Sequence, residues 1–143
     1  DIGCKYNGYC SDFSRVVFVE EVKEEYKKIY DFVLEEQNKI STLLKSGANL
    51  KSIIRDRESE YKLKGLQVLH SFGHGVGLEI HELPFLNSKQ DWTLRANTII
   101  TIEPGVYFPN KFGIRIEDTY VVNKDKCESL FSADKDYTII KLL

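Results

Sequence analysis

The alternation of hydrophobic and polar residues changes along the chain and predicts a hairpin followed by two helices. Asn7-Gly8 stands between short runs of aromatic and β-branched residues, which is a strong hairpin signal. From about Val22 to Lys45, hydrophobic residues recur at intervals of three and four, and lysine and glutamate occupy the other face. This period predicts an amphipathic helix, which Gly47 ends. A shorter helix is predicted from about Asn49, a favourable N-cap residue, to Lys64.

The sequence after Gly65 is rich in glycine and in strand-forming residues. The segment NTIITIEPGVYF (97–108) predicts strand that is broken at Pro104-Gly105, and Pro109 then marks a turn because proline cannot donate within a central ladder. The segment GIRIEDTYVV (113–122) has the period-two alternation of a half-buried strand. NKDK predicts a further turn, and the tail SADKDYTIIKLL predicts a last short strand. A hairpin, two helices and several strands in this order predict an α+β fold.

Composition narrows the class of protein. A chain of 143 residues with 42% hydrophobic and 29% charged residues is typical of one soluble globular domain. The net charge of −2 predicts no general attraction to nucleic acid or to an anionic membrane, and no hydrophobic run is long enough to span a bilayer. Three cysteines without a repeated spacing argue against a disulfide scaffold and favour the reducing cytoplasm.

Asp1 and Asp12 are predicted to project from the same face of the N-terminal hairpin. If Asn7-Gly8 forms a two-residue turn, Asp1 lies opposite Ser14, and Asp12 lies on the diagonal of the same face. Two carboxylates on one face repel each other unless a cation lies between them. Exposure of both groups to solvent is the alternative interpretation of this pair.

Glu103 and Glu117 are predicted to form a second pair of carboxylates. A three-residue loop at residues 109–111 sets a register in which the two glutamates stand opposite each other. Glu103 stands among hydrophobic residues and Glu117 stands between Ile116 and Asp118. Burial of an unpaired carboxylate is costly. Taken with the first pair and with His74, they predict a site whose negative charge two divalent cations would balance. Oxygen ligands with a single imidazole suit Mn²⁺, and also Co²⁺, Zn²⁺ or Fe²⁺.

All three histidines stand in the glycine-rich segment HSFGHGVGLEIHELP, residues 70–84. His70 and His74 have the spacing of a helical zinc pair, but the glycines between and after them oppose a helix. These glycines are expected to let the backbone approach a ligand or a sheet closely. A phosphate-binding loop is not predicted, because no Lys-Ser/Thr pair follows. Taken alone, His81 would more often be an ordinary buried histidine, and Arg115 a surface residue of a strand.

The chain carries four motifs in a fixed order: DIG with GYCSDFSR, HSFGHGVGLEIHELP, TIEPGVYF and GIRIED. Together they resemble the successive motifs of the pita-bread metallopeptidases, especially Xaa-Pro aminopeptidase and prolidase, over essentially the whole chain. The resemblance implies a pita-bread fold, with an antiparallel curved sheet and helices packed on one face. The catalytic domain of that family is longer, so residues 1–143 are expected to be its C-terminal portion, without the upstream half or any N-terminal domain.

The resemblance also implies a role for individual side chains. Two metal ions are expected to be bound by Asp1, Asp12, His74, Glu103 and Glu117, with Asp12 and Glu117 bridging them. His70 and His81 are expected to bind substrate and stabilise the tetrahedral intermediate, and Glu103 to help the attacking water lose a proton. Arg115 is expected to maintain the electrostatics of the site and to contact the substrate. Tyr107 is also expected to contact the substrate.

The activity implied by the resemblance is dinuclear-metal-dependent hydrolysis of the peptide bond before proline, as in an Xaa-Pro aminopeptidase. Manganese is the expected metal, and the expected partner is a peptide with proline after the scissile bond. An Xaa-Pro dipeptidase (prolidase) and a non-catalytic binding module stay open as alternatives. Methionine aminopeptidase is less similar, because GIRIEDTYVV resembles the proline-directed branch. A homodimer, or a companion chain that supplies the missing half, is also expected.

Overall fold

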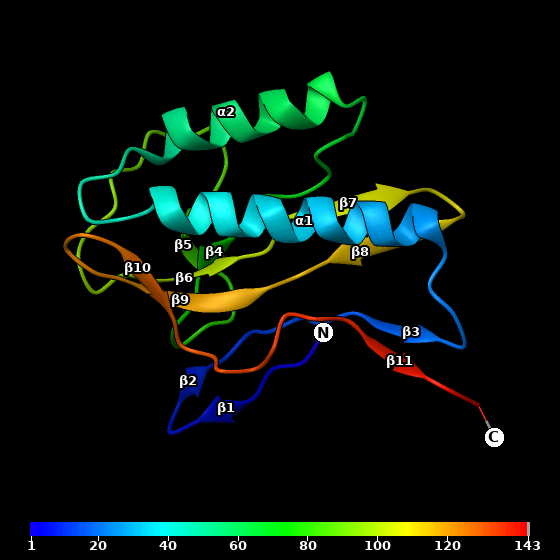
Figure 1. The fold of residues 1–143 in the computed structure, drawn as a ribbon. Helices are drawn as coiled ribbons and strands as arrows, with labels where there is room; N and C mark the ends of the chain where they lie inside the picture. Colours follow the sequence, from blue (N-terminus) through cyan, green and yellow to red (C-terminus); the bar gives the residue numbers. More distant parts are fainter. Residues whose placement is uncertain (143) are drawn as a thin grey trace.

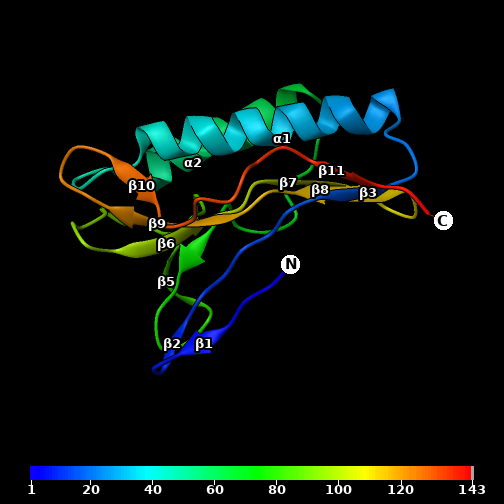
Figure 2. The ribbon, with the colours of Figure 1, turned by 60° about the horizontal axis from the view of Figure 1, so that its bottom comes forward.

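Two helices cover one face of an antiparallel sheet in the computed structural model, which describes residues 1–142 (Figures 1 and 2). Helix α1 is Glu24–Leu43 and helix α2 is Leu50–Leu63, close to the predicted bounds. The side chain of Asn49 accepts a hydrogen bond of 3.0 Å from the backbone N–H of Ser52, so the predicted N-cap of α2 is confirmed. No helix among the described residues is long and apolar enough to cross a membrane.

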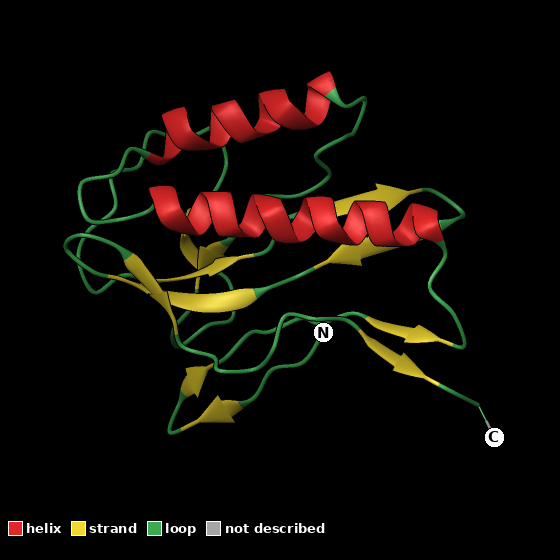
Figure 3. Ribbon diagram, in the orientation of Figure 1, coloured by secondary structure: helices red, strands yellow, loops and turns green. Residues whose placement is uncertain are grey.

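The main sheet contains five antiparallel strands, shown in yellow with the smaller pairs in Figure 3. Their order across the sheet is β10 (Cys127–Ser129), β9 (Asp118–Val122), β6 (Ile99–Ile102), β4 (His74–Gly75) and β5 (Glu82–Phe85). Strands β7 (Gly105–Phe108) and β8 (Phe112–Arg115) form a separate hairpin. In the chain, β7 follows β6 and β8 precedes β9. The predicted α+β class is therefore confirmed.

The register of these strands places Glu103 opposite Glu117, as predicted. Phe108 pairs with Phe112 around a three-residue loop, and the same register continues to the pair Ile102–Asp118. The segment 113–122, predicted as one strand, is instead two strands, because the ladder is interrupted at Ile116 and Glu117. At this interruption Glu117 forms a β-bridge with Ser14 from the N-terminal segment. The break therefore lets a third segment reach the carboxylate pair.

The N-terminal hairpin also has the predicted register. Strands β1 (Lys5–Tyr6) and β2 (Tyr9–Cys10) pair with Tyr6 opposite Tyr9, and Asn7 and Gly8 both have positive φ, as a type I′ turn requires. The register continues to the bridge between Ile2 and Phe13. The hairpin thereby brings Asp12 to β9 of the main sheet, where the Thr119 hydroxyl donates to the carbonyl oxygen of Asp12, and it brings Asp1 to Arg115 at the end of β8.

The predicted last strand is present as β11 (Thr138–Ile140), which pairs in parallel with β3 (Val17–Val19) at the end of the molecule that holds the C-terminus (Figure 1). The core lies between the helices and the sheets, and the predicted hydrophobic faces of both helices are buried in it. Its fully buried side chains include Val33, Ile40, Leu50, Ile54, Tyr61, Ile100, Ile102, Ile116 and Val122. The three cysteines are free thiols.

Candidate metal centre

The five predicted metal ligands converge from distant parts of the chain. Three groups of side chains each offer ligand atoms that lie within 4.8 Å of one another. The groups are Asp1 with Asp12 and Glu117, His74 with Glu103 and Glu117, and Asp12 with His74 and His81. Asp12, His74 and Glu117 each belong to two groups, so the three groups form one continuous cluster.

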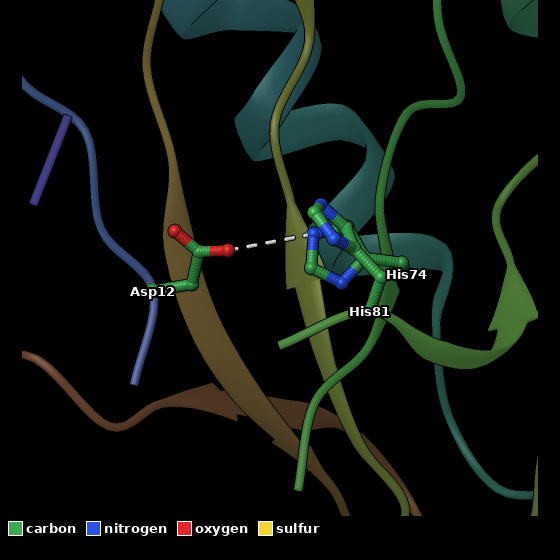
Figure 4. Close-up of side chains that lie close together, drawn as sticks. All are labelled: Asp12, His74 and His81. Carbon is green, nitrogen blue, oxygen red and sulfur yellow. Dashed lines mark ion pairs between the residues drawn. The ribbon is translucent and has the colours of Figure 1, made fainter. Parts of the chain in front are cut away.

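His74 presents a lone pair to the carboxylates. Its Nδ1 lies 2.9 Å from the carbonyl oxygen of Gly75, which can only accept, so Nδ1 carries the proton in the neutral ring. Its Nε2 lies 3.3 Å from Oε1 of Glu103. The same atom lies 3.5 Å from Oδ2 of Asp12, the ion pair dashed in Figure 4. Burial lowers the pKa of His74 and so favours this neutral ring. An imidazole lone pair that faces two carboxylates is an arrangement that a cation would stabilise.

Three of the four carboxylates are largely buried, whereas the side chain of Asp1 is 50% exposed. Asp12 is 6% exposed and Glu117 is 1% exposed. Burial, and then the negative charge of Glu117, raise the pKa of Glu103 to about 8. Burial also raises the pKa of Glu117, against the hydrogen bond from Ser14 that lowers it. The raised pKa values show that ionisation of these carboxyl groups is unfavourable without a cation. A divalent cation would favour the ionised forms, so the donor set fits the metal ions that the motifs imply.

Hydroxyl groups hold the candidate ligands in place. Ser14 donates a hydrogen bond of 2.8 Å to Oε2 of Glu117, and Thr119 donates one of 2.9 Å to the carbonyl oxygen of Asp12. Thr101 accepts a hydrogen bond of 3.0 Å from the N–H of His74, and its hydroxyl lies 3.4 Å from Oε1 of Glu103. Such outer partners orient metal ligands. No role for these three hydroxyl groups was predicted from the sequence, although Ser14 lies within the motif GYCSDFSR.

The glycines near His74 allow a close approach of two strands. Gly75 lies on β4, and a Cβ atom there would lie 2.8 Å from the carbonyl carbon of Leu83. The expectation that these glycines let the backbone approach a sheet is confirmed at this position. The helical zinc pair is excluded by structure as well, because His74 stands on a strand.

His70, Tyr107 and Arg115 lie along one side of the cluster. The Nε2 atom of His70 lies 2.9 Å from the Tyr107 hydroxyl, to which Nη1 of Arg115 donates at 3.2 Å. Nδ1 of His70 lies 3.8 Å from Oε2 of Glu103, and Arg115 pairs with Asp1. Arg115 is the last residue of β8 and its side chain is 30% exposed, so it is a strand residue at the surface whose guanidinium also contacts the cluster.

His81 lies on another side of the cluster and is exposed, so its interpretation as an ordinary buried histidine is wrong. Its ring centroid lies 4.3 Å from that of His74 (Figure 4). A nitrogen of His81 is near enough to Asp12 and His74 to share a cation with them, a role that the motifs did not imply.

Comparison with known proteins decides the family. Residues 1–124 match metallopeptidase family M24. The chain belongs to metallopeptidase family M24. It is 43% identical over 141 residues to an uncharacterized peptidase of Methanocaldococcus jannaschii, covering 94% of this chain and 40% of that protein. It is 39% identical over 139 residues to the Xaa-Pro dipeptidase of Pyrococcus furiosus, covering 95% of this chain and 40% of the dipeptidase.

The fold of this M24 chain is also found in a solved structure. The X-Pro aminopeptidase of Thermotoga maritima superimposes with a TM-score of 0.90 at 35% identity, over 96% of this chain and 40% of that one. The pita-bread fold implied by the motifs is thereby confirmed. The M24 chain spans about 40% of the length of the relatives that it matches.

Proposed function

We propose that the protein is a metal-dependent peptidase that hydrolyses the peptide bond before proline. One observation carries this proposal: the lone pair of His74 Nε2 faces Glu103 at 3.3 Å and Asp12 at 3.5 Å, and all three side chains are largely buried. Membership of family M24 supports the reaction class, and relatives named Xaa-Pro dipeptidase and X-Pro aminopeptidase support the choice of bond.

The five clustered side chains would hold two divalent cations, with Asp12 and Glu117 as the shared ligands. This assignment is supported by the way the groups overlap, because Asp12 and Glu117 occur together with Asp1 and each also occurs in a second group with His74. When bound, the cations supply Lewis-acid polarisation of the scissile carbonyl and a lowered pKa for the attacking water. Four carboxylates with one imidazole favour manganese, with cobalt, zinc and iron as alternatives.

The remaining side chains handle the substrate and its protons. Glu103 accepts the proton that the attacking water loses, since its carboxyl group lies beside both His74 and His70. His70 and His81 flank His74 and stabilise the negative charge that develops on the carbonyl oxygen. Tyr107 and Arg115 are joined by a hydrogen bond of 3.2 Å and contact the substrate, and the guanidinium of Arg115 balances the charge of Asp1.

An Xaa-Pro aminopeptidase is our first assignment, and an Xaa-Pro dipeptidase is the alternative. The experiment compares an Xaa-Pro dipeptide with an Xaa-Pro-Yaa tripeptide, using the full-length protein loaded with Mn²⁺. Release of the first residue from the tripeptide supports an aminopeptidase, and turnover of the dipeptide alone supports a dipeptidase. An Xaa-Ala-Yaa tripeptide is the control for the requirement for proline. Bound metal without hydrolysis of any peptide would contradict the enzymatic assignment and favour a binding module.

We also propose that the protein is located in the reducing cytoplasm and that it associates with another protein chain. The location is supported by three free thiols, of which Cys4 is exposed. The assembly is either a homodimer or a complex with a companion chain that supplies the upstream half. The companion chain is supported by the 40% of each relative's length that the chain spans. Analytical ultracentrifugation of the full-length protein tests the dimer directly.

A further inference from the structure

A buried amide lies behind the two glutamates of the candidate metal centre. Gln37 stands on helix α1 and is 0% exposed. Its Nε2 atom donates a hydrogen bond of 3.0 Å to the carbonyl oxygen of Ile102 and one of 3.3 Å to that of Ile116. These two residues directly precede Glu103 and Glu117. One side chain therefore joins the two strands at the positions where each presents a carboxylate.

The amide acts where the sheet itself does not join the strands. The ladder between β6 and β9 ends at Ile102–Asp118, and the ladder between β7 and β8 ends at Gly105–Arg115. The carbonyl groups of Ile102 and Ile116 lie at this interruption. Ile102 is the last paired residue of β6, whereas Ile116 belongs to neither ladder. A buried carbonyl without a donor is unfavourable, so Gln37 gives the carbonyl of Ile116 a donor that the sheet does not supply and ties it to the end of β6.

The orientation of the amide is determined by its other partner. Lys135 donates a hydrogen bond of 2.7 Å to Oε1 of Gln37, which leaves the two N–H groups of Nε2 for the carbonyls. The ammonium group also lies 2.9 Å from Oδ2 of Asp118 and donates to the Tyr120 hydroxyl at 2.9 Å. The C-terminal segment thus contributes the cation that orients the amide.

Arg15 completes this arrangement beside Glu117. Its guanidinium donates a hydrogen bond of 2.7 Å to Oδ1 of Asp118 and one of 2.9 Å to the carbonyl oxygen of Glu117 itself. Asp118 is 0% exposed, so its charge is balanced by Arg15 and Lys135 together. Gln37 and these three charged groups form a connected network on the backbone that carries the ligands.

We propose that Gln37 is a positioning residue that sets the separation of Glu103 and Glu117, with Lys135 orienting its amide. The inference rests on the proposed metal site, and it adds a residue that touches neither substrate nor metal. The two hydrogen bonds from Gln37 fix the backbone directly before Glu103 and Glu117, so their loss is expected to weaken metal binding by both carboxylates. A role in stability alone would lower the melting temperature and leave the metal affinity unchanged.

The test compares two neighbouring substitutions in the full-length protein. Gln37→Met keeps the length of the side chain but removes both hydrogen bonds to the carbonyls. Glu36→Met is the matched control, because Glu36 is also 0% exposed on α1 but pairs with Arg57 at 3.5 Å and Lys39 at 3.2 Å. Mn²⁺ affinity is measured by calorimetric titration, the ligand field by the visible absorption of bound Co²⁺, and stability by thermal unfolding in chelator.

The expected result is a loss of Mn²⁺ affinity of roughly 10- to 100-fold in Gln37→Met, together with a changed Co²⁺ spectrum. The Glu36→Met variant is expected to melt at a lower temperature but to bind Mn²⁺ like the wild type. Equal affinities in the wild type and Gln37→Met would overturn the inference and leave the proposed function intact. A wild-type protein that binds no metal would instead contradict the proposed function.

Lys135→Met provides a second variant if Gln37→Met does not fold. Its side chain is 27% exposed, so its replacement disturbs the core less. The amide stays but loses its orienting donor, and a smaller decrease in Mn²⁺ affinity is expected, with a spectral change of the same kind. An unchanged affinity and an unchanged Co²⁺ spectrum in this variant would contradict the proposed role of Lys135.

Discussion

The hydroxyl group of Ser14 donates a hydrogen bond of 2.8 Å to Oε2 of Glu117, a residue 103 positions later in the chain. Both side chains are buried, and the backbones of the two residues form an isolated β-bridge. This contact joins the segment that carries Asp1 and Asp12 to the strand that carries Glu117. The two halves of the candidate metal centre are therefore aligned by a direct contact between their backbones.

Replacement of Ser14 tests this alignment. Ser14→Ala leaves one carboxylate oxygen of Glu117 without its donor, so Mn²⁺ affinity and turnover are expected to fall by roughly 10-fold or more. Ser14→Thr, which keeps the hydroxyl, should retain most of both. Ser41→Ala is a control, because the Ser41 hydroxyl donates only to the Asn38 carbonyl on an exposed face of α1. Calorimetric titration and steady-state kinetics provide the two measurements.

Replacement of the ligands themselves is expected to abolish activity without unfolding the protein. Glu103→Gln removes a negative charge at constant shape, and His74→Ala removes the lone pair that faces Asp12 and Glu103. Neither change removes a hydrophobic side chain of the core, so the circular dichroism spectrum should stay as in the wild type. Full turnover of an Xaa-Pro peptide by either variant would contradict the assignment of Glu103 and His74 to the metal centre.

Replacement of Tyr107 tests whether its hydroxyl group takes part in the reaction. Its ring lies against the bare backbone of its cross-strand partner Gly113, where an added Cβ would lie 2.5 Å from the ring atom Cδ1. Tyr107→Phe keeps this packing but loses the contacts with His70 and Arg115, so turnover is expected to fall while the melting temperature changes little. Gly113→Ala displaces the ring and should lower both quantities. Equal turnover in Tyr107→Phe and wild type would show that the hydroxyl has no part in the reaction.

The metal-free protein is expected to become less stable as the pH rises. Burial raises the pKa of Glu103 from 4.5 to about 8, so between these values the folded protein keeps a proton that the unfolded chain releases. The melting temperature measured in chelator should therefore fall from about pH 5 to about pH 8. Saturating Mn²⁺, which favours the ionised carboxylates, should oppose this fall. Glu103→Gln is the control and should show a weaker dependence on pH in chelator.

Removal of the metal is expected to abolish hydrolysis reversibly. The ligand oxygens belong to carboxylates that repel one another without a cation, so the chelated protein should also melt at a lower temperature at neutral pH. Activity should return on addition of Mn²⁺, and Co²⁺, Zn²⁺ and Fe²⁺ should be compared at equal concentration. Turnover that persists after exhaustive dialysis against chelator, with no metal found by elemental analysis, would contradict a metal-dependent mechanism.

The registers of two hairpins were predictable from the sequence because they depend on short turns. Asn7-Gly8 favours positive φ at both positions, and this turn aligns the strands as far as Ile2 and Phe13. The loop at residues 109–111 similarly aligns the strands so that Glu103 stands opposite Glu117. The helices were equally predictable, since their hydrophobic period is local and Asn49 caps the second one.

The set of elements, the two carboxylate pairs and the motifs of family M24 were thus predictable from local patterns. The way in which the two pairs meet was not, because it depends on contacts between distant segments. The bridge between Ser14 and Glu117 and the contacts of Gln37 with two strands join residues from 65 to 103 positions apart. No turn links such distant segments, so their contacts depend on how the helices and the sheet bury a common core. The interruption of the strand at Glu117 also depends on a distant segment. The alternation of hydrophobic and polar residues predicts a strand there, but it does not show that Ser14 will pair with Glu117.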